Sequence, residues 1–170
     1  MGLITTPVAG SVLSVATFGS LVAQQFQEVI RAVDGSGIVS TTLALEPVLT
    51  LNGVANATYE YLCRFWYGAD GTAAGFQAVP SIPSGASVNW ETPDGTNGTP
   101  PSGTQYSGVL SGTASAASWA TQNGVLTASI TGTVRMGSVD GAIGVKVART
   151  GGSGTLTIKG NSRLSLIRTA

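Results

Sequence analysis

Two hydrophobic spacings divide the chain close to residue 37. Apolar side chains recur every three or four residues between Val15 and Val33, and this spacing predicts one amphipathic α-helix. Ser14 can cap the start of that helix, and Gly35 favours its end. Pro7 disfavours helix at the residue before it, so residues 1–13 are predicted to form an extended arm.

After Gly37 apolar residues alternate with polar ones, as they do in half-buried strands. The clearest alternation spans residues 58–67. One face of this segment carries Tyr59, Tyr61, Cys63, Phe65 and Tyr67, and the other carries Thr58, Glu60, Leu62, Arg64 and Trp66. Further strands are predicted over residues 38–45, 48–51, 76–79, 86–92, 125–136, 142–149, 154–159 and 163–168.

Turns rich in Gly and Pro separate these strands, and residues 94–108 contain enough turn dipeptides to predict a long exposed loop. Many short strands with regular turns are typical of a sandwich or a jelly roll. The sequence therefore predicts a mainly β protein. An antiparallel jelly-roll-like β-sandwich over residues 37–170 is preceded by an N-terminal extended arm and one α-helix over residues 1–36.

The composition of the 170 residues excludes several classes of protein. Charged residues make up only 9% and the formal net charge is zero, whereas a nucleic-acid binder needs basic residues to neutralise phosphates. The apolar fraction of 42% is too high for a disordered chain. Residues 1–27 carry no charged side chain, but Pro7, Gly10 and several Ser, Thr and Gln residues interrupt the apolar run. We therefore expect no membrane span.

Candidate chemistry is equally limited. The chain has no histidine, which removes Ser-His-Asp and Cys-His catalysis and imidazole metal ligands. The single cysteine, Cys63, lies in an apolar run and is predicted to be a buried small side chain rather than a reactive thiol. Glu91, Asp94 and Asp70 lie in or beside predicted turns, without the fixed pairing that a glycosidase requires. We expect no enzymatic activity, no cofactor and no metal site.

Charge is unevenly distributed along the chain. Residues 1–132 contain two basic and seven acidic side chains, whereas residues 133–170 contain six basic and one acidic. Two interpretations are open. Lys and Arg can protect edge strands against aggregation, which is the commoner use. Alternatively, the basic C-terminal strands face an acidic surface of another subunit.

The large aromatic side chains are the remaining candidates for ligand contact. Trp66, Trp90, Trp119, Tyr67 and Tyr106 can stack on sugar rings in the manner of jelly-roll lectins. Side chains of this kind more often fill a sandwich core or a subunit interface.

Two stretches resemble segments of tailed-bacteriophage virion structural proteins. Residues 7–18 (PVAGSVLSVATF) resemble an N-terminal signature in which Gly and small residues precede a helix. Gly19 replaces the usual Asn after the aromatic residue, and the usual early Trp is missing. Residues 130–134, 144–148, 154–159 and 162–166 are similar to the last strands of phage head-fibre, decoration and tail-associated proteins with a TNF-like jelly roll, although residues 160–162 depart slightly from the usual Gly-Ser step.

This resemblance implies a non-catalytic homotrimer on the virion, made in the host cytoplasm. We expect a capsid decoration protein, of the cement or head-fibre type, on the capsid exterior. Its arm and helix would bind the major capsid protein or another virion subunit, through Pro7, Val8, Val15, Phe18, Val22 and Phe26. The alternative is a tail-associated receptor-binding or fibre protein that holds host surface glycans through Trp90 and Tyr106.

Overall fold

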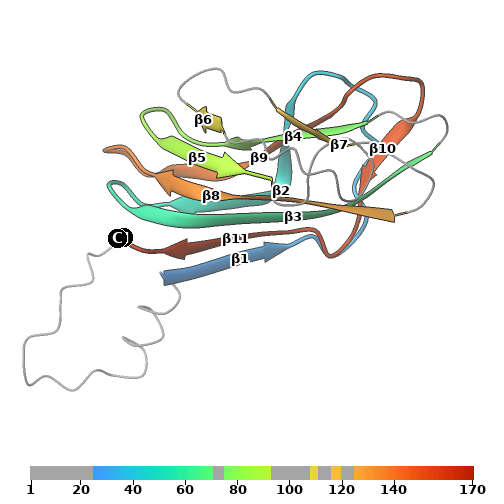
Figure 1. The fold of residues 1–170 in the computed structure, drawn as a ribbon. Helices are drawn as coiled ribbons and strands as arrows, with labels where there is room; N and C mark the ends of the chain where they lie inside the picture. Colours follow the sequence, from blue (N-terminus) through green and yellow to red (C-terminus); the bar gives the residue numbers. More distant parts are fainter. Residues whose placement is uncertain (1–24, 71–74, 93–107, 111–115, 120–124) are drawn as a thin grey trace, which may run out of the picture.

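The computed structural model describes residues 25–70, 75–92, 108–110, 116–119 and 125–170, and these residues form eleven β-strands (Figure 1). Most of the strands alternate apolar with polar side chains or are rich in β-branched residues, and both features suit a pleated, half-buried surface. The strands are β1 (Phe26–Ile30), β2 (Ala44–Gly53), β3 (Thr58–Asp70), β4 (Phe76–Ser81), β5 (Ser87–Glu91), β6 (Gly108–Leu110), β7 (Ala117–Trp119), β8 (Val125–Arg135), β9 (Gly141–Arg149), β10 (Thr155–Ile158) and β11 (Arg163–Arg168).

The strands form two antiparallel sheets. The larger sheet has the order β1-β11-β3-β8-β5-β6, with β10 pairing the last residues of β3, and the smaller sheet has the order β2-β9-β4-β7. Five of the pairs are nested along the chain: β5 with β6, β4 with β7, β3 with β8, β2 with β9, and β1 with β11. The chain is thus wound like a rolled hairpin, an arrangement consistent with the predicted jelly-roll-like sandwich.

Strand β3 lies in the middle of the larger sheet (Figure 1) and follows its predicted alternation. Its core face is at most 2% exposed and consists of Tyr59, Tyr61, Cys63, Phe65 and Tyr67. The smaller sheet packs against this face. The ring of Phe76 in β4 lies 5.0 Å from that of Phe65 and 4.7 Å from that of Tyr67, measured between centroids. The Tyr61 hydroxyl donates a hydrogen bond of 3.1 Å to the main-chain oxygen of Gly144 in β9.

The helix predicted between Val15 and Val33 is not shown by the structure. Residues 15–24 of that prediction lie outside the described residues, but Phe26–Ile30 form strand β1 instead of helical turns. β1 pairs antiparallel with β11, so that Val29 lies beside Leu164. Pairing with this distant strand outweighs the local helical spacing. β1 lies in the segment predicted as an anchor, and the division of the chain at residue 36 stays a prediction.

The two strands predicted over residues 38–45 and 48–51 differ from the structure, where one strand, β2, runs from Ala44 to Gly53. Its register with β9 shifts between Leu45 and Thr50. The shift falls around Pro47, which has no N–H group to donate to a neighbouring strand. Glu46, in this irregular stretch, is buried despite its charge.

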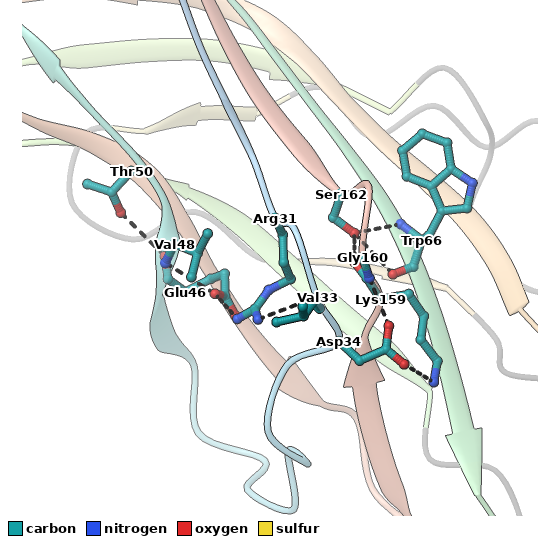
Figure 2. A network of polar contacts seen from close by, with 10 residues as sticks. All are labelled: Arg31, Val33, Asp34, Glu46, Val48, Thr50, Trp66, Lys159, Gly160 and Ser162. Carbon is teal, nitrogen blue, oxygen red and sulfur yellow. Dashed lines mark hydrogen bonds and ion pairs between the residues drawn. The ribbon is translucent and has the colours of Figure 1, made fainter.

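A buried ion pair joins the rims of the two sheets (Figure 2). Arg31 follows β1, Glu46 belongs to β2, and an Nη atom of Arg31 lies 2.6 Å from a carboxylate oxygen of Glu46. The two side chains are 10% and 7% exposed. The same carboxylate oxygen accepts a hydrogen bond of 3.2 Å from the N–H group of Val48. Desolvation makes such a pair costly to form, but removing one partner leaves a buried charge without compensation and costs far more.

We predict that Glu46→Gln lowers the free energy of unfolding by about 3 kcal/mol, because it leaves the Arg31 guanidinium buried without an opposite charge. Urea denaturation followed by circular dichroism measures this change. The matched control is Lys159→Gln, which removes the exposed ion pair with Asp34 and should lower the free energy of unfolding far less, because exposed ion pairs contribute little. Equal losses in the two variants would contradict a special role for the buried pair.

Candidate functional site

The outer face of the larger sheet is the surface on which exposed apolar and basic side chains meet. Because alternate residues of a strand point to opposite faces, Glu60, Leu62 and Arg64 of β3 point away from the core and are exposed. The register with β11 places Ile167 beside Glu60, and Arg163 beside Arg64. Side chains from several strands therefore share this face.

Three exposed apolar side chains form what we call the apolar corner of this face: Phe26, Leu62 and Ile167. Phe26 of β1 lies directly opposite Ile167 of β11, and Leu62 of β3 is the diagonal neighbour of Ile167. Their exposed fractions are 48%, 42% and 44%. Adjacent exposed apolar side chains on a sheet mark a candidate contact with another molecule. Because Phe26 begins β1, the N-terminal residues join the sandwich at this corner.

The opposite end of the same face carries what we call the arginine–tryptophan cluster: Arg64, Trp66 and Arg163. The guanidinium carbon of Arg64 lies 5.8 Å from the centroid of the Trp66 ring, and that of Arg163 lies 5.5 Å from it. The two arginines are directly opposite each other in the β3–β11 register. The two ion pairs found among the described residues involve neither of them.

Hydrogen bonds fix the main chain at Trp66 (Figure 2). The N–H group of Trp66 donates to the hydroxyl of Ser162 at 2.9 Å, and that hydroxyl donates to the main-chain oxygen of Lys159 at 2.8 Å. The N–H group of Lys159 donates in turn to the main-chain oxygen of Trp66 at 2.7 Å. Ser162 is fully buried. In Figure 2 the Trp66 indole points away from these polar contacts.

A second set of contacts holds the turn between β10 and β11. The Asp34 carboxylate accepts hydrogen bonds of 2.9 Å from the N–H group of Gly160 and from the Lys159 ammonium. The Gly160 N–H group, and after it the Lys159 ammonium, lower the pKa of the Asp34 carboxyl below its usual value. Asp34 therefore stays charged at neutral pH and ties the segment after β1 to the turn before Ser162.

Hydroxyl side chains line the neighbouring strand on the same face. In β8, Thr127 lies opposite Trp66, and Thr131 lies opposite Leu62. Thr133 continues the row two residues further along. Thr127 is exposed and the other two are half-buried. The outer face thus offers hydroxyl groups beside its charged and aromatic side chains.

Five of the six basic residues between 133 and 170 lie in strands that have neighbours on both sides, so the first interpretation of the charge distribution is wrong for these five. The edges are β1, β6 and β10 in the larger sheet, and β2 and β7 in the smaller one. The sixth basic residue, Lys159, directly follows β10. Each strand that carries a basic residue from this part of the chain is flanked by two others. These residues are Arg135 in β8, Lys146 and Arg149 in β9, and Arg163 and Arg168 in β11. An acidic partner surface stays a prediction.

The buried ionisable groups of β3 offer no reactive chemistry. Burial raises the pKa of the Cys63 thiol far above its usual value, and it also raises the pKa of Tyr61. Burial raises the pKa of Tyr67 to about 12. All three groups therefore stay protonated at neutral pH, and the prediction that Cys63 is a buried small side chain is confirmed.

The structure places only two of the predicted contact residues. Phe26 lies in the apolar corner, and its role in contacting another virion subunit stays a prediction. Trp90 is 4% exposed and belongs to the core, so it has no free ring face for a glycan, and this corrects its assignment as a glycan contact. The rest lie outside the described residues: Pro7, Val8, Val15, Phe18, Val22 and Tyr106.

Two features of the site were missing from the sequence-based predictions. The alternation of residues 58–67 places Arg64 and Trp66 on one polar face, so two of the three members of the arginine–tryptophan cluster have a signal in the sequence. Arg163 joins them only through the pairing of β11 with β3. The Arg31–Glu46 pair has no local signal, because Arg31 follows β1 of the larger sheet and Glu46 belongs to β2 of the smaller one.

Comparisons with known proteins identify no family. No family model matches the chain, and no curated protein matches it. Among solved structures, one similar chain comes from the tripod of the baseplate of bacteriophage Tuc2009, with 11% identity and a TM-score of 0.38, over 99% of this chain and 76% of that one. Within the described residues, no group of three His, Cys, Asp or Glu side chains is placed to hold a metal ion, and no helix meets the length and hydropathy of a membrane span.

We predict that Cys63 does not react with a thiol reagent such as Ellman's reagent in the native protein, because the thiol is buried and stays protonated. In a denaturing concentration of guanidinium chloride, one thiol per chain should react at once. Absorbance at 412 nm follows both reactions. Rapid reaction under native conditions would show that β3 opens locally and that the core face is accessible.

Proposed function

We propose that this chain is a non-enzymatic structural protein of a tailed-phage virion, and more narrowly a capsid decoration protein. In this proposal its N-terminal segment attaches it to the major capsid protein on the capsid exterior, and the sandwich projects outward as a homotrimer. The chain would be made in the host cytoplasm and added to the assembled shell. Its role would be to stabilise that shell.

The observation that carries the proposal is the apolar corner beside the start of β1. Phe26, Leu62 and Ile167 are exposed together at the point where the uncharged N-terminal segment joins the sandwich. In this proposal the uncharged leading segment and the adjacent exposed apolar corner would both contact the same large partner. Repeated attachment over a symmetric shell would then multiply modest single contacts.

Two properties of the sequence are compatible with the proposal. The four C-terminal segments that resemble phage virion proteins coincide with β8, β9, β10 and β11, and these strands belong to both sheets. The absence of histidine from the whole sequence removes the commonest general base of hydrolytic enzymes. Both features favour a packing subunit over a catalyst.

We predict that deleting residues 1–24 abolishes co-sedimentation with capsids and leaves a folded sandwich. The cut lies before β1, so every described strand and the Arg31–Glu46 pair are retained. A cut at residue 36 would remove β1 and leave Glu46 buried without its partner. Circular dichroism and the melting temperature check the fold, and sedimentation with purified capsids checks binding.

Phe26→Ser tests the apolar corner separately. Full burial of a large apolar side chain contributes about 1.5–3 kcal/mol, and Phe26 is already about half-buried, so this variant should bind capsids about three- to tenfold more weakly. The matched control is Val139→Ser, which truncates a valine that is 62% exposed in the turn between β8 and β9. Full binding by the deletion variant would refute the anchor. Equal weakening by the two point variants would refute the corner.

The copy number in the virion distinguishes the two phage roles. We predict hundreds of copies per particle, because a decoration protein repeats with the lattice of the shell. Quantitative mass spectrometry of purified virions measures this number against the major capsid protein. A handful of copies would instead favour the tail-associated receptor-binding protein.

A further inference from the structure

We propose that the arginine–tryptophan cluster binds an anionic group carried on a carbohydrate or polyol chain. The chemistry in question is a carboxylate or phosphate attached to a hydroxylated backbone, as in acidic polysaccharides and polyol phosphates. This inference does not depend on capsid attachment. The cluster lies four residues along β3 and β11 from Glu60 and Ile167, which is about 13 Å at the usual strand rise.

The first argument is electrostatic. The β3–β11 register fixes Arg64 and Arg163 side by side on one face, and like charges in directly opposite positions of a sheet destabilise it. Neither arginine takes part in an ion pair among the described residues. Stacking of both guanidinium groups against Trp66 offsets part of this repulsion. An anion held between the two arginines would remove the rest.

The second argument concerns the shape of the ligand. Guanidinium groups donate in a planar fork that matches a carboxylate or phosphate, so two adjacent arginines favour one anionic group over separate ones. The indole of Trp66 adds an apolar surface for the C–H groups of a sugar or polyol. Thr127 lies directly opposite Trp66 and is exposed, which supplies a hydroxyl partner for a hydroxylated chain. A carbohydrate fits this combination better than an acidic peptide.

The third argument is preorganisation. The Ser162 hydroxyl and the Lys159 N–H group fix the main chain on both sides of the Trp66 peptide (Figure 2). Arg64 and Arg163 lie on two paired strands inside the sheet and not on a loop. A site built on paired strands loses little conformational entropy when a ligand binds.

The test is isothermal titration calorimetry of the full-length protein with four short oligomers of similar length. These are an oligomer of galacturonic acid, an oligomer of glycerol phosphate, a neutral oligomer of galactose and an oligomer of glutamate. Binding of either of the first two, at least tenfold tighter than the galactose oligomer, is the expected result. The acidic oligomer that binds more tightly shows whether the cluster prefers a carboxylate or a phosphate.

Variants locate the binding on the cluster. Arg64→Gln and Arg163→Gln should each weaken binding by about tenfold or more, because each removes charge-assisted hydrogen bonds. Trp66→Ala should also weaken it. The matched control is Arg135→Gln, an exposed arginine on the outer face of β8, opposite Thr58 and away from Trp66. The Arg135→Gln variant should bind the acidic oligomer with an affinity within about twofold of that of the unsubstituted protein, because salt screens exposed charges at this range. Melting temperatures confirm that each variant is folded.

Three outcomes would overturn the inference. Equal or tighter binding of the glutamate oligomer would assign the cluster to an acidic protein partner. An equal loss in Arg135→Gln and Arg64→Gln would show only general attraction by a basic surface. Absence of binding by both acidic oligomers would show that Trp66 stacking alone accounts for the paired arginines.

Discussion

The period-two alternation of β3 is the constraint on which the rest of the structure depends. One set of alternate side chains, from Tyr59 to Tyr67, is almost fully buried and receives the smaller sheet. The other set must then point outward, whatever its chemistry. A slip of one residue would bury Arg64 and expose Phe65, so the core fixes the register. The same register determines which side chains of β8 and β11 lie beside Arg64 and Trp66. The candidate site is therefore a consequence of how the core is packed.

At the rim, where the apolar core ends, polar contacts hold β1 in position. Arg31 and Glu46 join the two sheets through a buried ion pair, and Gln27 of β1 donates a hydrogen bond of 3.2 Å to the main-chain oxygen of Asn52 in β2. These contacts attach the edge strand β1, which pairs with β11 in the larger sheet, to the smaller sheet. Hydrophobic burial is non-directional, whereas a buried ion pair leaves few alternative positions for its partners. We infer that the core supplies most of the stability, and that the rim contacts fix where the N-terminal segment leaves the sandwich.

Local pattern predicted most of the strands but not β1, β6 or β7, and it predicted no strand pairing. Residues 58–67 alternate so clearly that β3, its buried face and the burial of Cys63 were all predicted from the sequence. The segment Phe26–Ile30 was predicted as helix because Phe26, Val29 and Ile30 fit a helical period near 3.6 better than the period of two of a strand. Pairing with β11, more than 130 residues later, decides between them, and no local pattern reports that pairing. Trp90 shows the same limit of local pattern. The sequence does not say whether an aromatic residue in a strand faces the core or the solvent.

The positions of the basic residues argue that the outer face has a use. A chain with so few charges can place arginines at strand edges, where they prevent unwanted pairing at little cost. Here Arg163 lies in β11 between β1 and β3, where its backbone is already paired and needs no such protection. Its side chain lies instead opposite another arginine, an arrangement that costs stability in the isolated protein. Natural proteins carry such local costs mainly at functional sites. The Glu28 carboxylate of β1 lies on the same face, but it accepts a hydrogen bond from Ser165 and forms an ion pair with neither arginine. The opposed arginines at this end of the sheet therefore suit the proposed anion site.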